Sequence, residues 1–158
     1  MSLLKTILPK NWSPAERSRS ILIIVFLFLS SLSFAQNTYS GNDLHALGFS
    51  IVTYDTSALE NVRNNDLYYF GKAILQDNET KLKFIKDDDL YFLGKSLLSK
   101  EVKELEFVKN DDWYYFGTAM KEKTMPYLDN IKDDNIYYLG KALFTRDLGF
   151  LNKISREE

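Results

Sequence analysis

The chain contains no cysteine and a single histidine, and these absences remove several kinds of chemistry. Without thiols there can be no disulfide, thiolate metal site or lipid-modified N-terminal cysteine, so stability has to come from packing and backbone pairing. A Ser-His-Asp catalytic set could use only His45. The sequence contains no glycine-rich phosphate loop and no zinc-ligand motif. It therefore predicts a protein that is not an enzyme and that holds no cofactor or metal.

The chain also has little net charge, −2 at neutral pH, and this charge is unevenly distributed. Residues 1–35 carry four basic side chains against one acid, a net charge of +3. The remaining 16 basic and 21 acidic side chains give residues 36–158 a charge of −5. Because a mildly acidic surface does not attract a phosphate backbone, nucleic acid is not expected as a partner.

One apolar run, residues 21–35, follows the basic side chains and reads ILIIVFLFLSSLSFA. It is shorter than the roughly 20 residues that span a bilayer, but its length suits the apolar region of a signal peptide. Ser33 and Ala35 supply small residues at positions −3 and −1 of a cleavage site before Gln36. We predict that residues 1–35 are a signal peptide and that the protein is periplasmic, secreted or at the cell surface, but not a lipoprotein. An uncleaved segment, which would then be the only contact with a membrane, is the alternative.

Residues 36–158 repeat with a period of 23. The last four copies contain NDLYYFGKAIL (65–75), DDLYFLGKSLL (88–98), DDWYYFGTAMK (111–121) and DNIYYLGKALF (134–144), and a degenerate first copy reads NDLHALGFSIV (42–52). Fixed-period self-similarity is the signature of a repeat architecture. We therefore predict a single repeat domain over residues 36–158, with five copies centred on Gly48, Gly71, Gly94, Gly117 and Gly140.

Each copy is predicted to be a β-hairpin. Acidic and amide residues such as Asp87-Asp88-Asp89 separate two apolar runs, and they close turns through their side chains. The flanking aromatic and β-branched residues suit strands. The acidic run could instead bind Ca²⁺, but it lacks the alternation and the glycine of known calcium loops. The predicted fold class is thus mainly β, with stacked hairpins and short helical turns in connectors such as 99–104 and 122–127.

A helical interpretation of the same residues remains open. Asp89 could cap a helix, and Leu90, Leu93 and Leu97 have helical spacing. However, a glycine inside every helix would cost about 1 kcal/mol in each copy. A unit of 23 residues also leaves little room for two helices and two turns, so hairpins are favoured.

Residues 131–143 (IKDDNIYYLGKAL) and 107–120 (FVKNDDWYYFGTAM) resemble the repeat of the DKNYY family, in which a polar Lys-Asp run precedes an apolar residue, Tyr-Tyr and Gly-Lys. The resemblance covers roughly residues 55–155. It departs from the family in replacing the second lysine by an acid or amide, as at Asp87-Asp88, and the first copy lacks the tyrosines. The resemblance implies an envelope or secreted bacterial repeat protein and brings no catalytic residues. A weaker likeness exists to the aromatic hairpin repeats of bacterial cell-wall-binding modules.

The paired aromatic residues are the feature that suggests a ligand. Aromatic faces stack on the apolar faces of sugars, and the side chains two positions before each glycine are the speculative ligand-stacking residues: Tyr69, Phe92, Tyr115 and Tyr138. The alternative is that these rings form the core and the ladders between hairpins. An exposed row would favour a glycan-binding module, and burial of all four would exclude it.

From these patterns we expect a non-enzymatic exported repeat protein of the DKNYY type, with a structural or binding role in the cell envelope or outside the cell. The expected partner is an envelope protein or a polysaccharide. Two alternatives stay open: a glycan- or cell-wall-binding module, and an inhibitor or immunity-type protein that binds a secreted partner.

Overall fold

The computed structural model of the protein describes residues 39–99 and 103–156, and every regular element in these ranges is helical. The compact unit begins at Tyr39. The signal peptide predicted for residues 1–35 lies outside the described residues. In the two described ranges, no helix is both long and apolar enough to span a bilayer.

Helices of two kinds alternate along the described chain. The α-helices are α2 (Gly41–Thr53), α3 (Asn65–Leu75), α4 (Asp88–Leu98), α5 (Asp111–Glu122) and α6 (Asp134–Thr145). Each is followed by a short 3₁₀ helix: η2 (Thr56–Asn61), η3 (Glu79–Phe84), η4 (Lys103–Phe107), η5 (Met125–Asn130) and η6 (Leu148–Lys153). From α3 to α6 the α-helices begin 23 residues apart. One α-helix and one 3₁₀ helix therefore make one repeat unit.

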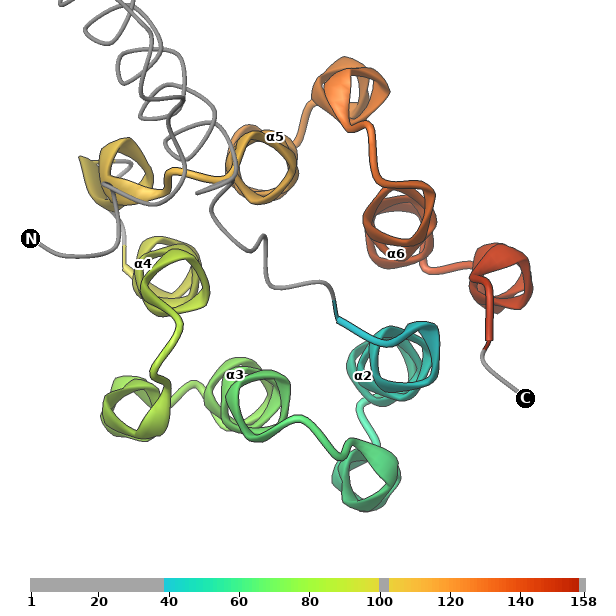
Figure 1. The fold of residues 1–158 in the computed structure, drawn as a ribbon, viewed down its shortest axis with the longest axis horizontal. Helices are drawn as coiled ribbons and strands as arrows, with labels where there is room; N and C mark the ends of the chain where they lie inside the picture. The colour runs from blue at the N-terminus through green and yellow to red at the C-terminus, as the bar shows by residue number, and fades with distance from the viewer. Residues whose placement is uncertain (1–38, 100–102, 157–158) are drawn as a thin grey trace, which may run out of the picture. The chain divides into compact units, whose positions relative to one another are not determined.

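The repeat units of residues 39–156 close into a ring (Figure 1). Each α-helix packs against the next one, and α2 packs against α6. The 3₁₀ helices lie outside the circle of α-helices (Figure 1). The final helix, η6, packs against both α6 and α2. The two ends of the array thus cover each other, as the terminal units of an open array cannot.

The prediction of a mainly β fold with stacked hairpins is wrong, because the acidic and amide clusters begin helices. The Asp87 side chain accepts a hydrogen bond from the Leu90 N–H (2.9 Å) and so caps α4. Only a few extended residues around Ile85 precede this cap. Adjacent tyrosines, which a strand would send to opposite faces, instead touch edge to face: the ring centroids of Tyr68 and Tyr69 are 5.3 Å apart.

Two helices fit into 23 residues because the second is a 3₁₀ helix. A 3₁₀ helix rises about 2.0 Å per residue, so a short one spans more length than the same number of α-helical residues. Tight turns connect the pair: Asp77 follows α3 with φ 47°, and the Asn78 side chain then caps η3 by accepting from the Thr80 N–H (3.0 Å). The expectation that 23 residues leave little room for two helices and two turns is therefore wrong.

From α3 to α6, the glycine inside each α-helix is the contact point for a leucine of the preceding 3₁₀ helix. A Cβ atom on Gly94 would lie 2.6 Å from Leu82 Cδ2, and one on Gly117 would lie 2.6 Å from Leu105 Cδ2. Both leucines are buried. Burying a leucine contributes about 2–3 kcal/mol, which exceeds the helix-propensity cost of about 1 kcal/mol for glycine. Tertiary packing therefore overrides the local preference against glycine.

An aspartate in the first turn of α3, α4 and α5 joins each of these helices to the next repeat. The two carboxylate oxygens of Asp66 accept hydrogen bonds from the Lys86 N–H (3.0 Å) and the Asp87 N–H (3.2 Å) of the next repeat. Asp89 and Asp112 repeat this arrangement 23 and 46 residues later. We call these bonds the aspartate clamps. They fix the start of each helix to the helix before it.

The ring closes because residues 148–156 supply the half-repeat that α2 lacks. A Cβ atom on Gly48 would lie 2.6 Å from Leu151 Cδ2, which is the contact that interior glycines make with the preceding 3₁₀ helix. In the sequence, the first copy has Gln36 at the position of this leucine. Ser155 also approaches α2 closely, since a Cβ atom on Gly41 would collide with the Ser155 carbonyl oxygen. We call this junction of η6 and α2 the seam.

Candidate functional site

The four predicted ligand-stacking residues, Tyr69, Phe92, Tyr115 and Tyr138, are all half-buried. Two of them lie against a phenylalanine of the following 3₁₀ helix. The centroids of Tyr69 and Phe84 are 4.8 Å apart in a stacked arrangement, and those of Phe92 and Phe107 are 5.0 Å apart. Among the described residues, no ring contact joins any two of the four. They are neither an open row nor a buried ladder, and ligand stacking by them stays a prediction.

The most exposed rings of these pairs are ones that the sequence argument missed. Phe84 is 46% exposed and Phe107 is 48% exposed, on the successive helices η3 and η4. The sequence does contain a sign of them, since Phe84 and Phe107 occupy the same position of the 23-residue repeat. The same position holds polar residues in the other copies: Asn61, Asn130 and Lys153. We call Tyr69, Phe84, Phe92 and Phe107 the aromatic surface.

Two of the lysines that directly follow a mid-helix glycine cover the ring of the tyrosine three positions before that glycine. The Lys72 ammonium lies 4.7 Å from the centroid of the Tyr68 ring, and its Nζ donates to the Tyr68 hydroxyl (2.6 Å). Lys141 Nζ lies 5.2 Å from the centroid of Tyr137. Such cation–π contacts hold the tyrosine rings against the helix surface.

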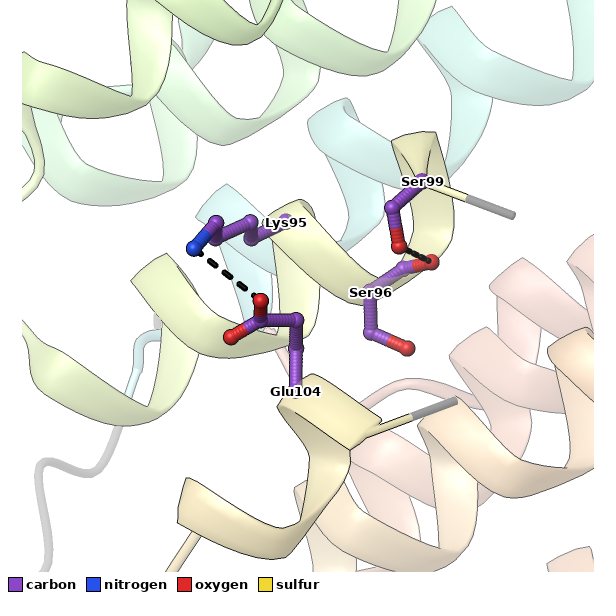
Figure 2. Close-up of polar contacts among 4 residues, drawn as sticks. All are labelled: Lys95, Ser96, Ser99 and Glu104. Atoms are coloured by element: carbon purple, nitrogen blue, oxygen red, sulfur yellow. Dashed lines mark hydrogen bonds and ion pairs between the residues drawn. The ribbon is translucent and has the colours of Figure 1, made fainter. Parts of the chain in front are cut away.

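In the third repeat the lysine instead forms an ion pair that joins α4 to η4 (Figure 2). Lys95 Nζ lies 3.0 Å from Glu104 Oε1, and the hydrogen bond to Glu104 raises the pKa of Lys95. Nearby, the Ser96 carbonyl oxygen accepts from Ser99 Oγ (3.3 Å) and from Lys121 Nζ (2.6 Å). An ammonium at the carboxyl end of a helix is favourable because carbonyl oxygens converge there. These contacts fasten α4 to its neighbours.

A cavity of about 630 Å³ lies on the first repeat. Ala46 and Asn61, which line it, stand 23 residues before Tyr69 and Phe84. In the register of the repeat, two residues that line the cavity thus stand where the second repeat has an aromatic pair. Its lining residues come from α2, η2, the segment after η2 and the C-terminal segment: Ser40, Asn42, Asp43, His45, Ala46, Phe49, Ala58, Asn61, Arg63 and Arg156.

His45, the only histidine of the chain, borders this cavity. Its Nε2 lies 2.8 Å from Arg156 Nη2, and burial together with the Arg156 charge lowers the pKa of His45. In the described ranges, no hydroxyl or carboxylate hydrogen-bonds to His45. In the structure, the side-chain partner of His45 is therefore Arg156, from the opposite end of the described chain.

The most strongly perturbed titratable group is Tyr39, which the sequence argument did not single out. Burial, followed by the charge and hydrogen bonding of Asp87 and the charges of Asp66 and Asp89, raises the pKa of Tyr39 far above its usual range. Its ring meets the edge of Trp113, with centroids 5.9 Å apart. Tyr39 therefore lies at the end of the ring where α3, α4 and α5 begin, and it stays protonated there.

The acidic run of the third copy forms part of the scaffold. Asp87 caps α4 and Asp89 clamps the next repeat. Within residues 39–99 and 103–156, no group of three histidines, cysteines or acids is placed to hold a metal ion.

Comparison with known proteins adds no relative, since no family model, no curated protein and no solved structure matches the chain. The likeness to the DKNYY repeat accordingly stays a resemblance, carried by the residues quoted above.

Proposed function

We propose that this chain is a non-catalytic, exported binding module that docks a partner protein on its aromatic surface. The observation that carries the proposal is the pair of exposed phenylalanines, Phe84 and Phe107, each backed by a second aromatic ring. Rings held in this way lose little side-chain entropy when a partner covers them. Buried aromatic anchors of this kind dominate the energetics of protein interfaces.

The surroundings of the rings favour a polypeptide over a polysaccharide. Stacking on a sugar requires a free ring face. The Phe84 ring already has Tyr69 stacked on it and the Lys83 ammonium 5.0 Å from its centroid. Phe107 likewise lies against Phe92. Each ring therefore has at least one neighbour that limits stacking on a sugar, and its exposed part suits insertion between the side chains of a partner protein.

Export rests on the sequence. A basic segment followed by the apolar run 21–35 and a small-residue cleavage site directs secretion, and the absence of cysteine fits a chain that needs no redox partner outside the cell. N-terminal sequencing of the protein recovered from the source cells tests this part. A chain that begins at Gln36 supports export, and a chain that keeps residues 1–35 contradicts cleavage.

The binding proposal is tested by capture with matched variants. The full chain, the double variant Phe84→Ser/Phe107→Ser and the control Leu148→Ser are immobilised and exposed to envelope and medium extracts. Leu148 is a suitable control because it is an exposed apolar residue on η6, away from the aromatic surface. Circular dichroism melts establish that all three fold.

We expect a polypeptide that the wild-type chain and the control retain, and that the double variant retains at least about tenfold less, as for two interface anchors. A benzophenone amino acid at position 107 should crosslink to the same polypeptide. Equal capture by the double variant would contradict the proposal, and so would retention of a polysaccharide with no polypeptide.

A further inference from the structure

We propose that the cavity on the first repeat binds a small molecule or chain end that combines an aromatic ring with a carboxylate. The inference is independent of the aromatic surface, because the cavity belongs to a different repeat and is lined by none of its residues.

The shape follows from the repeat itself. The second and third repeats place a ring from the α-helix against a ring from the 3₁₀ helix, and in the first repeat Ala46 and Asn61 hold the corresponding positions. Because the surrounding helices repeat, the walls that accommodate aromatic rings elsewhere are present here without their rings. The cavity of about 630 Å³ is within the range of small-molecule sites.

The first repeat also lacks the salt bridge that joins the α-helix to the 3₁₀ helix in the third repeat. There, Lys95 on α4 pairs with Glu104 on η4 across 3.0 Å, as Figure 2 shows. The corresponding residues of the first repeat are Phe49 and Ala58, both of which line the cavity. Phe49 is 37% exposed. An apolar ring entering the cavity would therefore meet Phe49, Ala46 and Ala58 rather than a salt bridge.

The charges at the cavity favour an anion. Arg63 and Arg156 both line it, and in the described part of the chain neither guanidinium pairs with a carboxylate. The one acid of the lining, Asp43, already has hydrogen-bond partners. Its carboxylate oxygens accept from Ser40 Oγ (3.0 Å) and from the backbone N–H of Arg63 (2.6 Å). Arginine binds carboxylates through paired N–H donors. A ring in the apolar part and a carboxylate at the arginines would use both halves of the cavity.

The probes are N-acetyl-phenylalanine, its carboxamide, and N-acetyl-alanine, titrated into the full chain and followed by ligand-observed NMR. We expect saturable binding of the first compound. We expect at least about tenfold weaker binding of the carboxamide, which lacks the charge, and of the alanine compound, which lacks the ring.

Variants place the binding in the cavity. Ala46→Tyr/Asn61→Phe restores the residues of the second repeat and should fill the space. We expect it to melt no lower than the wild type and to bind at least about tenfold more weakly. Arg63→Gln and Arg156→Gln should each weaken binding about five- to tenfold, whereas Phe84→Ser/Phe107→Ser should leave it unchanged.

Four outcomes would overturn the proposal. They are equal binding of the acid and its carboxamide, unchanged binding by the filled variant, unchanged binding by both arginine variants, and no saturable binding of N-acetyl-phenylalanine up to about 10 mM. Because the aromatic-surface variant is measured beside the others, failure here leaves the docking of a partner protein as a separate question.

Discussion

The seam and the interior junctions share one contact, a leucine of a 3₁₀ helix against a glycine of an α-helix. In the interior the two residues are close in sequence, whereas at the seam they come from opposite ends of the described chain. In the interior, Leu105 of η4 packs against Gly117 of the α-helix that directly follows. At the seam, Leu151 of η6 packs against Gly48, more than 100 residues earlier in the chain. The leucine and the glycine thus approach each other equally closely at both places, although the number of residues between them in the sequence is very different. Closing the long loop costs more chain entropy, but the cost grows only slowly with loop length.

The polar contacts differ more than the apolar ones. Asp112 clamps two backbone N–H groups of the next repeat, but at the seam Asn135 accepts only from the Ser155 N–H (2.9 Å). The seam adds two side-chain pairs of its own, Arg146 to the Tyr54 hydroxyl (3.1 Å) and Arg156 to His45. We therefore expect that apolar packing closes the ring. The single hydrogen bond that Asn135 accepts at the seam should hold it less strongly than the two bonds of an aspartate clamp.

The largest effect should come from removing the half-repeat that closes the ring. Deleting residues 148–158 exposes the Gly48 face of α2 and removes the buried side chains Leu151 and Ile154. At about 2–3 kcal/mol for each side chain, we expect the melting temperature to fall by roughly 15–20 °C. Circular dichroism melting measures it.

A matched pair of leucine variants sharpens this test. Leu151→Ala at the seam and Leu105→Ala in the interior remove equivalent contacts, and each should cost about 3 kcal/mol in the free energy of unfolding. If the deletion or Leu151→Ala leaves the melting temperature unchanged while Leu105→Ala lowers it, the ring is open in solution.

A smaller effect should separate the two kinds of clamp. Asp112→Ala leaves the N–H groups of Lys132 and Asp133 without their carboxylate acceptor, and we expect a loss of about 2–3 kcal/mol. Asn135→Ala removes a single neutral bond at the seam, for about 1 kcal/mol. Urea unfolding gives both values. Equal losses would show that the seam and the interior are held alike.

Two buried serines offer a third comparison, again between the first repeat and an interior one. Ser50 and Ser96 both follow a mid-helix glycine by two positions, where Ala73 stands in the second repeat. Ser50 Oγ donates to the Ala46 carbonyl oxygen (2.8 Å), but the buried Ser96 Oγ has no partner in the described ranges. Ser96→Ala should therefore raise the free energy of unfolding by about 0.5–1 kcal/mol. Ser50→Ala, its control, should not raise it, and an equal gain in both would contradict the assignment.

The smallest effect concerns pH at the seam. Because burial and Arg156 lower the pKa of His45, the unfolded chain takes up a proton near pH 6.5 that the folded chain resists. Stability from this group is complete above about pH 6.5 and falls as the pH decreases below it. Between pH 7.5 and 5, the melting temperature of the wild type should fall by about 1–2 °C more than that of His45→Tyr, which carries the residue of the later copies. An equal loss in both proteins would show that His45 does not sense the closure.

The repeat and its 23-residue period could be read from the sequence, but the hairpin predicted for each copy was wrong, since every regular element in the described residues is helical. The helical interpretation offered Asp89 as the cap, whereas the cap is Asp87 and Asp89 serves the next repeat. Hairpins were favoured because acidic clusters close turns as readily as they cap helices. Only the contact of Leu82 with Gly94, which no local rule contains, decides between the two.

The candidate site shows the same division. The aromatic positions can be identified in the 23-residue register, and Ala46 and Asn61 stand out there as gaps. That these two gaps face each other, so that a cavity forms, depends on how η2 lies on α2. The arrival of Arg156 at the same place could not be predicted locally, since it comes from the last residues of the described chain.

The sequence by itself determined the 23-residue period and the positions that carry rings, because both are read directly from the order of the residues. The tertiary structure alone decided that glycines sit inside α-helices, that the second helix of each unit is 3₁₀, and that the array closes at the seam. These outcomes depend on leucines buried against the backbone of another helix. The free energy of that burial exceeds the local preferences it overrides.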